Sequence, residues 1–151
     1  MLGTALILLA ALSFESPFSQ TASGQDRNPL FGTWSLNFAE STFTREPQYI
    51  RVTCQIEPWE SDGLKVIYDM VGTRGGVTHW EWTGKLDGKD HPLEGVEEVI
   101  TNAYSRTGDH TFSLILKVDG RISTASKIEV SPDGRTMVVT TASNKTVYNK
   151  R

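Results

Sequence analysis

The chain has 151 residues and a formal net charge of −3, and its basic residues are scattered singly along it. This length allows one domain, and the weak charge excludes a broad basic surface for nucleic acid. Cys54 is the only cysteine, which excludes an intramolecular disulfide and leaves the core alone to hold the fold. Its phase with Val52 and Ile56 favours a small buried residue over a reactive thiol or an intermolecular link.

The N-terminal residues have the pattern of a secretory signal. An apolar block over residues 2–12 is followed by a Ser/Thr/Gln-rich passage that ends in Ala22-Ser23-Gly24. This pattern predicts a signal peptide over residues 1–24 and an exported protein, periplasmic or extracellular. The block is shorter than the ~20 residues of a bilayer span, so no membrane span is expected after cleavage. No Lys or Arg precedes the block, which leaves a misplaced start or a retained interfacial anchor as alternatives.

After a leader at residues 25–31, the domain is expected over residues 32–151 as a succession of short strands. Alternating apolar residues and turn-forming residues predict nine strands. They lie at about residues 33–38, 49–57, 64–71, 77–86, 96–105, 110–118, 121–130, 135–142 and 145–150. The segment His91-Pro92-Leu93-Glu94-Gly95 between them is expected to be irregular, because proline cannot donate a hydrogen bond to a sheet.

Tight turns join most of these strands, and Asp119-Gly120 is the strongest hairpin signal. Hairpins in succession favour pairing between neighbours in the chain. Closing such a sheet removes its exposed edges. The sequence therefore predicts an all-β fold, an antiparallel up-and-down barrel of eight to ten strands, with a sandwich as the alternative.

An eight-stranded barrel is either just filled by its side chains or holds one small ligand. Four aromatic residues on predicted inward faces are the strongest candidates for a ligand pocket. With three further inward residues they form the candidate binding set, which is Tyr68, Trp80, Trp82, Phe112, Leu114, Ser126 and Tyr148. The competing interpretation is that these side chains simply fill the interior.

Nothing in the sequence points strongly to catalysis or to a cofactor. His79, His91 and His110 are far apart and lack the short spacing of metal ligands, so no metal site is predicted. Glu97 and Glu98 are adjacent on a strand and would face opposite sides. No catalytic residues are assigned, although an enzyme with residues brought together from distant loops stays open.

A series of short motifs resembles a known group of proteins. Gly32-Thr33-Trp34 resembles the Gly-x-Trp signature of the calycins, the group of lipocalins and fatty-acid-binding proteins. Together with further motifs in order, it resembles small exported bacterial lipocalin-like proteins of uncharacterised function. The series consists of Gly-Thr-Trp-x-Leu-Asn at residues 32–37, Ser41-x-Phe43, Gly63–Val66, Thr78–Glu81, Asp87–Asp90 and Pro132–Thr136. The resemblance implies a calycin barrel in which Trp34 plugs the closed end, often beneath an arginine, for which Arg135 and Arg151 are candidates.

Two departures limit what the resemblance implies about a ligand. Fatty-acid-binding proteins hold a carboxylate with an Arg-x-Tyr pair in the last strand, and here Thr146 stands at the arginine position while Tyr148 matches. They also cap the barrel with two helices, for which residues 39–48 are too few. The mouth is therefore expected to be covered by loops, as in lipocalins.

The leading hypothesis is non-catalytic binding of a small hydrophobic or amphipathic ligand in a monomeric barrel. A second is an envelope-associated interaction module with a filled barrel, which would contact its partner through residues 39–48 and 87–95. A third is a barrel enzyme that uses His79, His91 or Asp90 as an acid or base.

Overall fold

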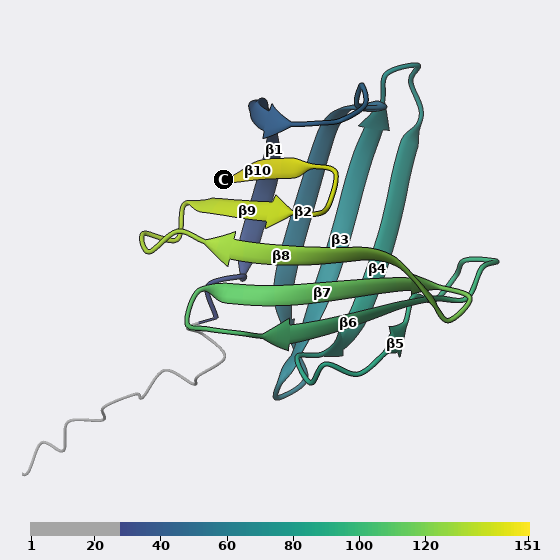
Figure 1. The fold of residues 1–151 in the computed structure, drawn as a ribbon, viewed down its shortest axis with the longest axis vertical. Helices are drawn as coiled ribbons and strands as arrows, with labels where there is room; N and C mark the ends of the chain where they lie inside the picture. The colour runs from purple at the N-terminus through teal and green to yellow at the C-terminus, as the bar shows by residue number, and fades with distance from the viewer. Residues whose placement is uncertain (1–27) are drawn as a thin grey trace, which may run out of the picture.

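The computed structural model describes residues 28–151, which form ten β-strands and no helix (Figure 1). The strands are β1 (Gly32–Thr42), β2 (Tyr49–Trp59), β3 (Gly63–Gly72), β4 (Val77–Lys85), β5 (His91–Pro92), β6 (Ile100–Arg106), β7 (Thr111–Val118), β8 (Arg121–Val130), β9 (Thr136–Thr140) and β10 (Lys145–Lys150). The predicted signal peptide lies outside the described residues and stays a prediction. Among residues 28–151 no helix has the length and hydropathy that a transmembrane helix requires.

The strands form one antiparallel sheet in the order β4-β3-β2-β1-β10-β9-β8-β7-β6-β5. Neighbours in the chain pair with each other, and β1 pairs with β10, which joins the two ends of the domain. In Figure 1 the strands β1 to β4 run behind β6 to β10 and cross them steeply, as in a strongly coiled sheet. The prediction of an antiparallel up-and-down barrel is confirmed, at the upper limit of eight to ten strands.

The barrel is nearly but not fully closed, because β4 and β5 do not share a hydrogen-bonded ladder. Side chains and single contacts hold the two edges together instead. The Trp82 indole Nε1 donates to the carbonyl oxygen of His91 over 3.0 Å, and Asp87 forms an isolated bridge with Ser105. The fold therefore has one seam at which the backbone is open.

The prediction that residues 91–95 are irregular is wrong for His91 and Pro92 and correct for Leu93, Glu94 and Gly95, which belong to no strand. His91 and Pro92 form β5, which pairs with Asn102 and Thr101 of β6. Proline is accommodated because β5 is an edge strand, so the side of Pro92 that lacks an N–H faces the seam rather than a neighbouring strand.

The strand predicted over residues 96–105 begins only at Ile100, and its facing, which the sequence left open, is now defined. Asn102 and Tyr104 are both buried and share one face. Tyr104 packs against Trp82, with the ring centroids 4.9 Å apart, so this face points into the barrel.

Trp34 seals one end of the barrel. Its side chain is fully buried, and its Nε1 donates to the carbonyl oxygen of Leu30 over 2.8 Å. Leu30 is itself fully buried, so residues expected to be a leader contribute to the core. The cation beside Trp34 is Lys150, whose Nζ lies 4.8 Å from the ring centroid. The two candidate arginines do not take this place, and Arg151 instead hydrogen-bonds Ser35.

Because the strands alternate in direction, β1, β3, β7 and β9 start at this sealed end, while β2, β4, β6, β8 and β10 start at the opposite end. The inward side chains near the seal are buried and form the closed half of the barrel. They are Leu30, Trp34, Cys54, Ile56, Leu64, Val66, Trp82, Tyr104, Phe112, Ile128, Val130, Met137 and Tyr148. The closed half is a packed core.

Candidate ligand-binding cavity

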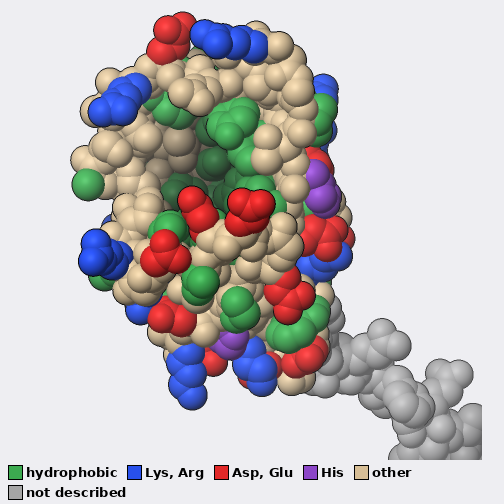
Figure 2. All heavy atoms as spheres, turned by 90° about the vertical axis from the view of Figure 1, so that its right-hand side faces the viewer, with side chains coloured by type: hydrophobic (Ala, Val, Ile, Leu, Met, Phe, Trp, Pro, Cys, Tyr) green, Lys and Arg blue, Asp and Glu red, His purple; other side chains and the backbone are tan. Residues whose placement is uncertain are grey.

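The other half of the barrel is not filled. Its inward side chains pack on the core but stay partly exposed, and we call them the open half. They are Leu36, Phe38, Tyr68, Met70, Trp80, Leu114, Ser126 and Val139. Figure 2 looks toward this end and shows a hollow whose floor and walls are hydrophobic side chains. A concave apolar surface with few polar groups is the usual form of a small-molecule site.

The structure divides the predicted binding set between the two halves. Tyr68 and Trp80 lie together in the open half, where their rings stack with centroids 4.6 Å apart. Leu114 and Ser126 face each other across β7 and β8 and are half-buried.

The other three predicted residues, Trp82, Phe112 and Tyr148, belong to the closed half. Trp82 and Phe112 are buried by their neighbours and do not line the hollow. The competing interpretation, that the predicted side chains simply fill the interior, therefore holds for these three residues. Tyr68 and Trp80 instead belong to the open half.

Polar groups meet where the two halves join. The Tyr68 hydroxyl interacts with the Cys54 thiol and with the hydroxyl of Tyr148. Burial raises the pKa of Cys54 from 9.0 to about 12, and the hydrogen bond from Tyr68 offsets part of this rise. Burial likewise raises the pKa of Tyr148 to about 12. Each of these groups is therefore neutral at physiological pH, and the surroundings disfavour negative charge.

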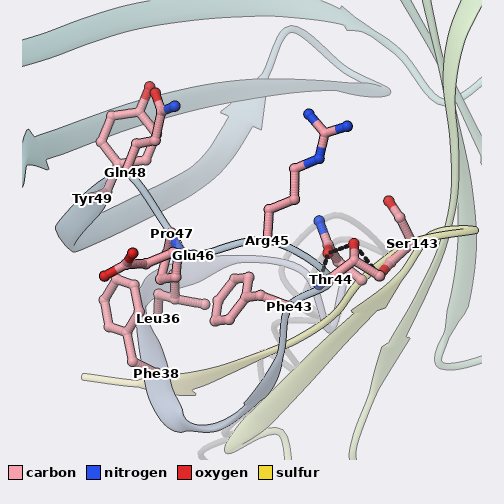
Figure 3. Close-up of a pocket in the computed structure, with 11 residues that line it drawn as sticks. Leu36, Phe38, Phe43, Thr44, Arg45, Glu46, Pro47, Gln48, Tyr49 and Ser143 are labelled. Atoms are coloured by element: carbon pink, nitrogen blue, oxygen red, sulfur yellow. Dashed lines mark hydrogen bonds between the residues drawn. The ribbon is translucent and has the colours of Figure 1, made fainter.

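A short segment between β1 and β2 covers part of the mouth. It encloses a cavity of about 670 Å³ together with the inward faces of Leu36 and Phe38. Figure 3 shows Phe43 and Pro47 turned toward these two side chains, whereas Arg45 extends away from them. The segment is held at Thr44, whose Oγ1 donates to the carbonyl oxygen of Ser143 over 3.0 Å. We call this loop of residues 43–48 the strap.

A second opening follows the seam. A cavity of about 860 Å³ lies between the edge of β4 and the segment that joins β5 to β6, and its walls include Trp80, Trp82 and Val96. Because no backbone ladder crosses the seam, the two sides can separate without breaking strand pairing. Trp80 therefore borders the opening along the seam.

Exposed aliphatic side chains surround the mouth. Among residues 28–151 the strongly exposed ones are Ile50, Val77, Val99 and Ile122. Each lies at or just before the start of β2, β4, β6 or β8, and these starts are at the open end. The apolar character of the hollow therefore continues onto its rim.

Sequence reasoning missed Asn102. This residue is 2% exposed, and it is the one non-aromatic polar side chain that is fully buried in the described part of the chain. It faces inward beside Leu116 of β7. The poor alternation of residues 96–105 hid it, although the shared parity of Asn102 and Tyr104 was a signal that could have found it.

His79 and His91 border the second opening, along the seam. His79 Nδ1 is 2.6 Å from Asp69 Oδ1 on the outer surface, and this carboxylate raises the pKa of the imidazole. His91 Nε2 contacts Asp87 over 2.9 Å, which lowers the pKa of that carboxyl. Within residues 28–151 no three metal-ligating side chains come together.

Comparisons with known proteins identify the architecture. No protein-family model matches the sequence, and none of the curated protein sequences is similar to it. Among solved structures, the chain is similar to a Schistosoma mansoni fatty acid binding protein in complex with arachidonic acid. The identity is 13%, the coverage is 83% of this chain and 98% of that one, and the TM-score is 0.59. The wild-type fluorescent protein UnaG is similar at 16% identity, with coverage of 81% and 97% and a TM-score of 0.57.

These likenesses establish the fold. This chain folds as a nearly closed antiparallel barrel of ten strands, similar in fold to the fatty acid binding protein. At such low identity they carry no ligand over to it. The predicted resemblance to bacterial lipocalin-like proteins is supported only for the barrel fold. The similar solved structures include UnaG and a fatty acid binding protein.

Proposed function

We propose that this protein binds one small hydrophobic or amphipathic molecule inside its barrel, without catalysis. The observation that carries the proposal is the contrast in burial along single strands. On β7, Phe112 is fully buried, whereas Leu114, two residues further along the same face, is partly exposed to the hollow. The exposed apolar surface inside the barrel would be stabilised by an apolar ligand.

The similarity to a barrel solved with arachidonic acid supports the proposal, because it gives a precedent for a ligand in this fold. The stacked Tyr68 and Trp80 supply an aromatic wall at which a flat or chain-like molecule would pack. We further propose that the protein acts as a monomer outside the cytoplasm, after removal of residues 1–24.

Titration with the neutral fluorescent probe Nile red tests binding directly. We expect saturable 1:1 binding with quenching of tryptophan fluorescence. Ser126→Phe would place a ring in the hollow and lower the affinity at least tenfold. Ala125→Phe is the matched control, since Ala125 is the next residue on the same strand and is exposed on the outer face.

Equal affinities of the Ser126→Phe and Ala125→Phe variants would contradict binding inside the barrel. Absence of saturable binding by the unmodified protein would remove the proposal altogether.

A further inference from the structure

One buried side-chain oxygen lacks a hydrogen-bond partner, and it is the only such side-chain atom among residues 28–151. The Oδ1 oxygen of Asn102 is closed to solvent and accepts no hydrogen bond from any described residue. A buried acceptor without a donor is costly, and native structures retain few of them. Its occurrence inside a barrel with a hollow points to a donor that arrives from within.

The position of Asn102 fits a ligand contact. The register places it opposite Leu116 of β7, which lies opposite Thr124 of β8. Leu116 and Thr124 are both partly exposed. Asn102 thus lies one inward row nearer the mouth than Tyr104, Leu114 and Ser126, and the pair of Ile100 and Val118 follows toward the mouth.

The interior lacks the charge that a carboxylate ligand would need. Among residues 28–151 no Lys, Arg or His is buried. Two cations share the inward faces of their strands, and both lie over buried rings at the sealed end, Lys150 over Trp34 and Arg106 over Phe112. Burying an unpaired carboxylate in such surroundings is strongly unfavourable.

The side of the entrance that leads to Asn102 also disfavours an anion, whereas Arg45 and Glu46 both lie on the strap side. Glu94, Glu97 and Glu98 lie in the exposed segment that leads into β6 and Asn102. Figure 2 shows acidic side chains directly on the lower rim of the hollow, while the Lys and Arg side chains in that view stand farther from it. A negatively charged ligand would meet like charge at the rim.

We propose that the ligand is an uncharged amphipathic molecule whose O–H or N–H group donates a hydrogen bond to Asn102 Oδ1. This inference rests on the proposed function. The chemical class is that of long-chain alcohols and amides rather than of fatty acids. The hydrocarbon part would lie against Tyr68, Trp80 and Leu114.

Displacement of bound Nile red by 1-dodecanol and by dodecanoate at pH 7.5 tests the class. The two compounds share a chain length and differ in charge and in donor capacity. We expect dodecanol to displace the probe at a concentration at least tenfold lower than dodecanoate. Equal or tighter binding of dodecanoate would overturn the inference while leaving the proposed function intact, whereas failure of Nile red itself to bind would overturn both.

Asn102→Leu tests the contact. Loss of one hydrogen bond should weaken dodecanol binding about tenfold, and the loss of Nile red affinity should be clearly smaller, because Nile red has no O–H or N–H group to donate to Asn102. Thr101→Val, at the neighbouring position of β6, is the control and should bind dodecanol as the unmodified protein does. Unchanged dodecanol affinity in Asn102→Leu would refute the assigned role. Should that variant fail to fold, the ratio of dodecanol to dodecanoate affinity in the unmodified protein still decides the class.

Discussion

The closed and open halves of the barrel are built by the same strands yet differ in how they are filled. In the closed half Trp34, Trp82 and Phe112 meet in a fully buried core. In the open half Tyr68, Trp80 and Leu114 pack on this core and keep part of their surface exposed. The difference shows that inward alternation along a strand does not by itself separate a core residue from a cavity residue.

The two halves differ because different parts of the chain close the two ends of the barrel. At the sealed end Leu30 and Trp34 close the barrel from inside the domain. At the other end the strap of residues 43–48 covers part of the mouth, and β4 and β5 leave the seam without a ladder. One end is thus sealed by buried side chains, while the other is covered by an exposed segment that a ligand could displace.

The largest expected effect is a difference in the free energy of unfolding between variants of two tryptophans, Trp34 and Trp80. Trp34→Ala should lower the free energy of unfolding by about 3–5 kcal/mol, because it removes a fully buried ring and leaves a cavity. Trp80→Ala should cost only about 1–2 kcal/mol, since Trp80 is partly exposed and loses mainly its stack on Tyr68. Chemical denaturation measures both values. The Trp80→Ala variant should lose more binding free energy for Nile red than free energy of unfolding. Equal unfolding costs for the two variants would contradict the division into a closed and an open half.

A smaller effect concerns Cys54, which lies at the boundary of the two halves. With burial raising its pKa from 9.0 to about 12, the thiolate at pH 8 should be roughly a thousandfold scarcer than in the unfolded chain. The reaction with a thiol-specific chromogenic reagent should therefore be slow in the folded protein and fast in denaturant. Rapid labelling of the folded protein would show that the open half extends as far as Cys54.

The smallest effect lies outside both halves, at His79. Asp69 raises the pKa of this imidazole above its usual 6.5. A raised pKa in the folded state means that the ion pair stabilises the protein below pH 6.5, and that this contribution is lost as the pH rises through the raised pKa. The pair is exposed, so salt should weaken the effect. NMR titration of His79 should give a pKa above 6.5 that falls in Asp69→Asn, and an unshifted pKa would contradict the contact.

Much of the fold was accessible from local patterns. The alternation of Val66, Tyr68 and Met70, and of Trp80 and Trp82, correctly assigned their inward faces, because a strand has a period of two residues. The hairpin at Asp119-Gly120 was likewise correct, and Asp119 adopts the positive φ of 50° that such a turn requires.

The errors came from edges and from long-range contacts. Pro92 reads as irregular in isolation and becomes a strand residue because β5 has only one neighbour. Lys150 replaces the expected arginine over Trp34, because the register of β1 with β10 pairs these two residues. Asn102 stayed unassigned, since poor alternation gives no facing without the partners that flank it.

From the residues alone follow the strand count to within one, the antiparallel order and which faces of most strands turn inward, since these depend on local periodicity and turn chemistry. Tertiary structure alone decided which inward side chains are buried and which line a hollow. That outcome depends on where ten strands bring their side chains together across the barrel, and these separations are not encoded in any single strand.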